Sequence, residues 1–148
     1  MNDRFKFRAW DTGLNMMMES LIDFDHASEE LCVHVGQILM QCTGLRDKDG
    51  ALIFEGDVVG HDEGAVGGKQ TEFCRYEVKI GEFSCECGDY YCTEGGVGVH
   101  VVGYRGFRRP DGSVDKYGGV TGLSHCPYVG RWSVLGNIHA NPELMEAV

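Results

Sequence analysis

The stretch QCTGLRDKDGALIFEGDVV, residues 41–59, decides the fold. Residues 47–50 read as a tight turn that ends on a glycine, where a positive φ is wanted. The apolar run at residues 52–54 leads into a second bend at residues 55–57 and then into another strand. A hairpin that feeds a bend and a further strand predicts a small β-barrel.

Strand patterns continue on both sides of this stretch. Residues 4–9 alternate strictly, with Phe5, Phe7 and Ala9 on one face and basic residues on the other. Further strands are predicted at residues 21–24, 31–35, 38–40, 73–83, 97–104 and 131–138. Residues 142–147 are expected to form a short final helix, because Asn141 can cap it and Pro142 suits its first position. The chain is therefore expected to be mainly β.

The composition sets the class of protein. The 148 residues are 43% hydrophobic, so one folded domain is expected. There is no apolar run long enough for a membrane span and no signal-peptide core at the N-terminus, which predicts a cytoplasmic protein. The net charge of −10 disfavours a general affinity for nucleic acid and suits a basic partner.

The middle of the chain is rich in glycine and cysteine. Residues 61–70 are predicted to be a loop or a long hairpin tip, with a turn further on at residues 111–112. Residues 84–130 look like an insertion between barrel strands. Long segments on a rigid scaffold often carry function, so a specialised role is expected there.

The seven cysteines raise the question of a metal. Their odd number and the absence of a secretory signal argue against a disulfide framework. A structural zinc ion is one hypothesis, with free thiols as the more common alternative and a redox pair as a third. The hypothesis assigns three ligands to Cys85, Cys87 and Cys92 and the fourth to Cys74, His100, His125 or Cys126. The spacing C-x-C is tighter than the usual C-x₂-C.

A nucleic-acid surface is a second hypothesis. Basic residues interleaved with an aromatic residue can hold a single strand by charge and stacking. The first predicted strand offers such a set in Arg4, Lys6, Arg8 and Trp10, and Arg105, Arg108 and Arg109 form another small basic cluster. The alternative is a solvated strand face beside a packed tryptophan.

Three separated motifs resemble the YopX-like phage proteins. They are FRAWD at residues 7–11, the stretch at residues 41–59, and VLGNIHANPEL at residues 134–144. The resemblance implies a phage or prophage product with an N-terminal β-rich segment, residues 1–42, and an SH3-type β-barrel in residues 43–148. It brings no catalytic residues. The residues that match motif positions are expected to be structural: Gly44, Gly50, Gly56, Asp57, Gly136, Asn137 and Pro142.

The expected function is that of a non-enzymatic accessory protein that binds a host or phage protein. A nucleic-acid-associated module, with or without zinc, is the alternative, and an enzyme whose residues meet only in the fold is a third. Because the edges of a small barrel need cover, self-association is also expected.

Overall fold

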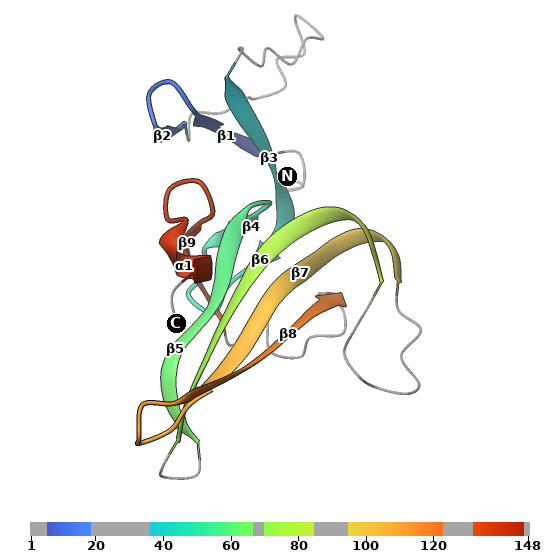
Figure 1. Ribbon diagram of the computed structural model, residues 1–148. Helices are drawn as coiled ribbons and strands as arrows, with labels where there is room; N and C mark the ends of the chain where they lie inside the picture. The colour runs from blue at the N-terminus through green and yellow to red at the C-terminus, as the bar shows by residue number, and fades with distance from the viewer. Residues whose placement is uncertain (1–5, 19–35, 67–69, 85–94, 123–131, 147–148) are drawn as a thin grey trace, which may run out of the picture.

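The computed structural model describes residues 6–18, 36–66, 70–84, 95–122 and 132–146, which form two antiparallel sheets and one short helix (Figure 1). The smaller sheet has the strand order β2-β1-β3-β4, and the larger has the order β8-β7-β6-β5-β9. The elements are β1 (Phe7–Asp11), β2 (Met16–Met18), β3 (Gln37–Arg46), β4 (Leu52–Phe54), β5 (Asp57–Val66), β6 (Gln70–Ser84), β7 (Gly95–Arg108), β8 (Val114–Gly122), β9 (Ser133–Asn137) and α1 (Glu143–Glu146).

Strand β3 links the two halves of the smaller sheet. Its first part, from Gln37 to Gln41, pairs with β1, and its second part pairs with β4 at Cys42 and Arg46. The predicted boundary between residues 42 and 43 therefore falls inside β3, where its partner changes. Both predicted bends are present, with Gly50 at a φ of 85° and Gly56 at 83°.

The core lies on one face of the larger sheet. Strands β6 and β7 pair without a register shift, and alternate residues of β6 point into the core as predicted. Tyr76 stacks on Trp132 with ring centroids 5.0 Å apart. The buried residues that form this core cluster are Ile53, Val59, Cys74, Val78, Val101 and Trp132. Since Val101 belongs to β7, the described part of the predicted insertion is built into the sheet.

Two glycines allow the larger sheet to curl. A Cβ on Gly60 of β5 would lie 2.0 Å from the carbonyl oxygen of Cys74, and a Cβ on Gly103 of β7 would lie 2.0 Å from that of Arg75. Both neighbours of β6 thus approach its backbone at the same level, where no side chain would fit. Such glycine positions are where a sheet bends, and here the sheet forms a half-barrel (Figure 1).

The prediction of a mainly β chain with a short C-terminal helix is confirmed. The SH3 type of the half-barrel stays a prediction. Of the two alternatives for residues 61–70, a loop or a long hairpin tip, the structure has the hairpin, because β5 continues to Val66, pairs with β6 and is separated from it only by residues 67–69. The predicted strands at residues 21–24 and 31–35 lie outside the described residues. None of the described helices has the length and apolar character needed to cross a bilayer.

Candidate functional site

The candidate site is built around Asp57, the first residue of β5. The bend at Gly56 turns this carboxylate back toward β4, where the backbone N–H of Phe54 donates to its Oδ2 at 2.8 Å. The side chain is 1% exposed, so it depends on its neighbours for every polar contact. Accepting this backbone N–H at the bend is a structural role, which is the kind of role that the resemblance implied for Asp57.

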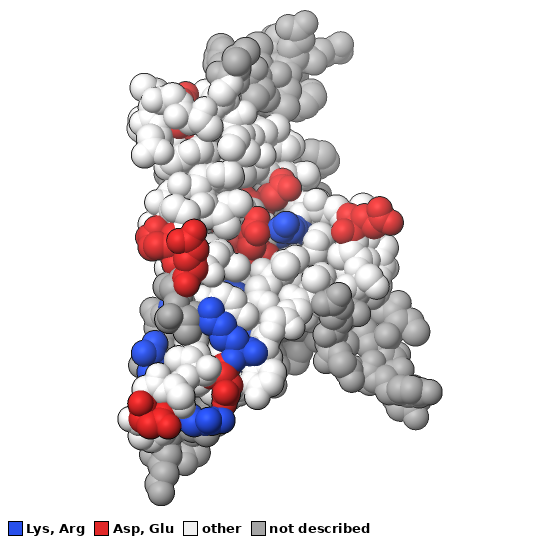
Figure 2. Space-filling view, in the orientation of Figure 1, with Lys and Arg blue, Asp and Glu red and all other residues white. Residues whose placement is uncertain are grey.

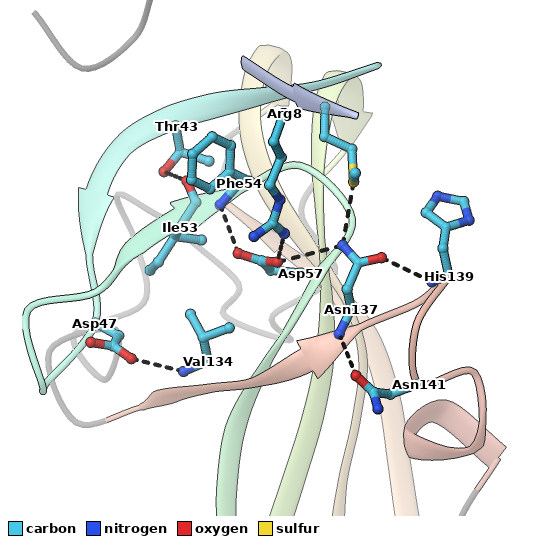
Figure 3. Close-up of polar contacts among 11 residues, drawn as sticks. Arg8, Thr43, Asp47, Ile53, Phe54, Asp57, Val134, Asn137, His139 and Asn141 are labelled. Carbon is cyan, nitrogen blue, oxygen red and sulfur yellow. Dashed lines mark hydrogen bonds and ion pairs between the residues drawn. The ribbon is translucent and has the colours of Figure 1, made fainter. Parts of the chain in front are cut away.

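Arg8 supplies the opposite charge from β1. Its guanidinium donates to Asp57 Oδ1 and lies over the ring of Phe54, with Cζ 4.4 Å from the ring centroid (Figure 3). The Arg8 side chain is 14% exposed. An ion pair this far from water is costly to break, because either charge alone would be poorly solvated.

Asn137, the last residue of β9, brings the third motif to the same place. Its side-chain Nδ2 donates to Met40 Sδ at 3.3 Å and lies 3.5 Å from Asp57 Oδ1. Its Oδ1 accepts from the N–H of His139 at 2.9 Å, and its own N–H donates to Asn141 Oδ1 at 3.3 Å. One buried amide therefore ties β3, β5 and the segment leading to α1 together.

We call Arg8, Phe54, Asp57 and Asn137 the motif junction, since each comes from one of the three sequence motifs. Next to the motif junction, Trp10 stacks on His139, with ring centroids 6.2 Å apart and ring planes 20° apart. Burial raises the pKa of Asp57, while the positive charge of Arg8 opposes that rise. A substrate could reach the carboxylate only by displacing these neighbours, so the junction acts as a structural lock.

A second carboxylate, Asp47, fixes the hairpin turn to β9. Its Oδ1 accepts from the N–H groups of Asp49 and Ala51, and its Oδ2 accepts from the N–H of Val134 at 2.9 Å. Burial alone would raise the pKa of Asp47, but these backbone hydrogen bonds outweigh it and the pKa is lowered. The motif junction and this turn together fix the two bends of residues 41–59 to the rest of the fold.

The basic residues predicted to bind nucleic acid have other roles where the structure describes them. Arg8 and Trp10 share a face of β1, as the alternation predicted. Arg8, however, pairs with Asp57, and Trp10 stacks on His139. Lys6 is half-buried, and its carbonyl accepts from the N–H of Cys42. Arg4 lies outside the described residues. Nucleic-acid binding through this set stays a prediction.

The predicted zinc ligands are only partly described. Cys74 and His100 lie within the described residues, and the others do not: Cys85, Cys87, Cys92, His125 and Cys126. Within that part of the chain no three His, Cys, Asp or Glu residues are grouped as a metal site would need. Cys74 faces Arg105 and His100 faces Lys79 across the β6–β7 pair. Five residues along β6 separate the two levels, which places the side chains on opposite faces and about 16 Å apart along the strand.

His100 is the better suited of these two residues. Its Nδ1 lies 3.1 Å from the carbonyl oxygen of Gly98, which can only accept, so Nδ1 is the donor, and in the neutral ring Nε2 is the nitrogen with the lone pair. Burial raises the pKa of the Cys74 thiol to about 11, whereas a zinc ligand must be a thiolate. Zinc binding itself stays a prediction.

Charge is unevenly spread over the face that carries α1. Figure 2 shows acidic side chains over α1 and over the middle and right of the view, while most Lys and Arg gather in its lower part. Both glutamates of α1, Glu143 and Glu146, are exposed. The first half of β6, the second half of β7 with the residue after it, and the start of β8 carry the basic residues Arg75, Arg105, Arg108, Arg109 and Lys116.

Comparison with known proteins identifies the family of the chain and a similar solved structure. A family model described as "YopX protein" matches residues 6–146, a span that contains all three motifs of the junction. The chain is similar to the crystal structure of protein EF1440 from Enterococcus faecalis, with 25% sequence identity, a TM-score of 0.46, and 95% of this chain and 96% of that chain covered. No curated protein matches the chain.

Proposed function

The chain belongs to the YopX protein family, and from that membership we propose that it is a phage or prophage accessory protein that binds another protein. The partner is a protein of the host or of the phage, and the binding takes place in the host cytoplasm without a catalytic step. The half-barrel, in this proposal an SH3-type roll, is the scaffold.

The observation that supports this proposal is the acidic surface of α1 on a locked framework. Glu143 and Glu146 are exposed side by side in one turn, and the junction fixes the segment that leads to them through Asn137 and Asn141. A rigid surface loses little conformational entropy on binding. A cluster of exposed negative charges accelerates and orients the approach of a positively charged partner.

The proposal is tested by affinity capture from host lysate with immobilised wild-type protein and the variant Glu143→Lys/Glu146→Lys. We expect the wild type to retain a basic protein reproducibly at low salt, and the variant to lose it. Glu82→Lys is the control for charge reversal at a distance from α1. Tyr104, whose hydroxyl lies 3.5 Å from the carbonyl oxygen of Leu144 in α1, faces Arg75 on β6. Glu82 is exposed seven residues further along that strand, about 23 Å away. Retention of no protein, or equal retention by the charge-reversed variant, would contradict the proposal.

A nucleic-acid-associated module is the second candidate, supported by the basic residues of β6, β7 and β8. Lys116 Nζ lies 4.4 Å from the ring centroid of Tyr104, and Arg108 is exposed nearby on β7. Charge next to an aromatic ring suits a single strand. Fluorescence anisotropy with labelled single-stranded DNA and RNA separates the candidates: this one requires salt-dependent binding that Arg108→Gln/Lys116→Gln weakens.

A further inference from the structure

Strand β8 lies at the outer edge of the larger sheet. Its nine residues pair with β7 from Val114 to Gly122 without a register shift, and the strand contains neither proline nor bulge. No other described strand pairs with its second edge. A long, regular edge of this kind presents backbone N–H and C=O groups to which another strand can bind.

The larger sheet repeatedly places an aromatic residue opposite a glycine. The cross-strand pairs of this kind are Phe73 with Gly106, Tyr76 with Gly103, Phe83 with Gly96, and Tyr104 with Gly118. At the first of these the ring covers the glycine so closely that an added Cβ would lie 2.2 Å from Phe73 Cζ. Covering a strand glycine with an aromatic ring restores the packing that the glycine lacks.

Strand β8 carries an aromatic residue and a glycine of the same kind on one of its two faces. Tyr117 is 63% exposed, and Gly119 follows two residues later on the same face of the sheet. Tyr117 faces Arg105 on β7. The exposed ring and the glycine of this edge strand are therefore two positions apart. In a symmetric antiparallel pairing of two such strands, centred on the residue between them, the ring of each copy faces the glycine of the other.

We propose that β8 pairs antiparallel with β8 of a second copy about a two-fold axis at Gly118. In an edge strand, only every second residue points its backbone N–H and C=O groups away from the sheet. Two such strands can therefore form hydrogen bonds only if even-numbered residues face even-numbered ones and odd-numbered residues face odd-numbered ones. Placing Gly118 opposite itself meets this condition and overlaps the whole strand. Tyr117 then faces Gly119 of the second copy, and the reverse contact follows from the symmetry.

The same register has no conflict of charge. Lys116 faces Val120 of the second copy, and Asp115 faces Thr121, so no like charges lie directly opposite each other. The contact is isologous, which closes the assembly at two copies and removes both β8 edges from solvent. The result is one continuous sheet made from two five-stranded halves.

The test is analytical ultracentrifugation over a range of concentrations with wild type, Gly118→Lys and Val97→Lys. A Cβ on Gly118 would have Gly103 O as its nearest atom at 3.5 Å, an ordinary contact, so the monomer accommodates the change. In the dimer two lysines would face each other on the axis, and we expect dimerisation at least about tenfold weaker. Val97 is 85% exposed on β7 and faces Glu82, so Val97→Lys gives the same charge change away from the edge and should remain dimeric.

A wild type that stays monomeric at every concentration overturns the proposal, whether another segment of the chain or a different protein covers the edge. A dimer that Gly118→Lys leaves unchanged, or assembly beyond two copies, also overturns it. If circular dichroism shows that Gly118→Lys is unfolded, Tyr117→Ala decides: it should weaken the dimer, and an unchanged dimer rejects the pairing. This outcome does not depend on whether α1 binds a basic partner.

Discussion

Arg8 of β1 and Asp57 of β5 form a buried ion pair although 49 positions separate them in the sequence. The pair attaches the smaller sheet to the start of the half-barrel, and the ring of Phe54 lies against the guanidinium (Figure 3). Because the carboxylate also accepts the N–H of Phe54, it supports the bend that precedes β5. The pair therefore connects the position of the smaller sheet to the shape of the hairpin.

Removal of one partner of this pair should be strongly destabilising. Asp57→Ala leaves the charge of Arg8 and the N–H of Phe54 without their acceptor, and we expect the free energy of unfolding to fall by about 3–5 kcal/mol. Arg8→Met should cost a similar amount, and the double variant less than the sum of the two. Urea denaturation of the four proteins measures this coupling.

The exposed pair Arg109–Asp115 provides the control, since its side chains are 49% and 40% exposed. Arg109→Met and Asp115→Ala should each change the free energy of unfolding by less than about 1 kcal/mol. Equal losses at the two pairs would mean that burial does not make the Arg8–Asp57 contact special.

Asp47 should stabilise the fold in a pH-dependent way. Its pKa is lowered from 3.8, so its contribution is present above about pH 3.8 and is lost as the pH falls through the folded-state pKa. Asp47→Asn cannot accept the N–H of Val134 as a carboxylate does, and should lower stability by about 1–3 kcal/mol near neutral pH. Thermal melting from acidic to neutral pH should show the two proteins converging as the pH falls. A gap that stays constant would refute the assignment.

Asp57 should titrate with the opposite sign. Burial raises its pKa above 3.8, so the stability that the folded state gains by protonating Asp57 is fully present below about pH 3.8 and is lost as the pH rises through the folded-state pKa, while the contacts of the carboxylate with Arg8 and Phe54 remain. The difference in melting temperature between wild type and Asp57→Asn should therefore shift in favour of the variant as the pH rises through this window. A shift in the other direction would show that Arg8 outweighs burial.

Gly103 should not tolerate a side chain. Gly103→Ala would place Cβ 2.0 Å from a backbone oxygen of β6, which cannot move without separating the strands, and we expect a loss of about 3 kcal/mol. Gly118→Ala is the matched control on the next strand, and stability there should be unchanged or raised by up to about 1 kcal/mol. Chemical denaturation measures both, and equal effects would argue against the close approach of β7 to β6.

The Cys74 thiol should be unreactive in the folded protein. With a pKa of about 11, only about one thiol in a thousand is a thiolate at pH 8, and the side chain is 1% exposed. Peptide mapping after treatment with iodoacetamide should find Cys74 unmodified in the native protein and modified in denaturant. Rapid modification of the native protein would show that β6 opens readily.

The zinc hypothesis makes a prediction about Cys74 as well. If the three clustered cysteines hold zinc with a histidine, Cys85→Ser should remove the metal, whereas Cys74→Ser should leave the zinc content unchanged because Cys74 points into the core. Elemental analysis of protein purified without added zinc measures this. Zinc-free wild type removes the hypothesis, and zinc loss in Cys74→Ser would place the fourth ligand in the core.

Local features were the most predictable from the sequence. The glycines at both bends, the alternation of β6 and the final helix each depend on a few neighbouring residues, and each is found where the pattern placed it. The partner of Arg8 was not predictable, because it depends on how β1, β3 and β5 come together over 49 positions. The sequence left residues 61–70 undecided between a loop and a long hairpin tip, because glycine and polar residues favour loops, and only pairing with β6 makes the segment up to Val66 a strand.

The motif junction also constrains when the protein can finish folding. A ribosome releases Arg8 and Asp57 well before Asn137, yet the amide of Asn137 is needed to complete the contacts around Met40 and Asp57. Until Asn137 has been synthesised, the Arg8–Asp57 ion pair can therefore be only partly buried. Final closure is left for the moment after translation has passed residue 137, and a nascent chain stalled earlier would be a natural target for chaperones and proteases.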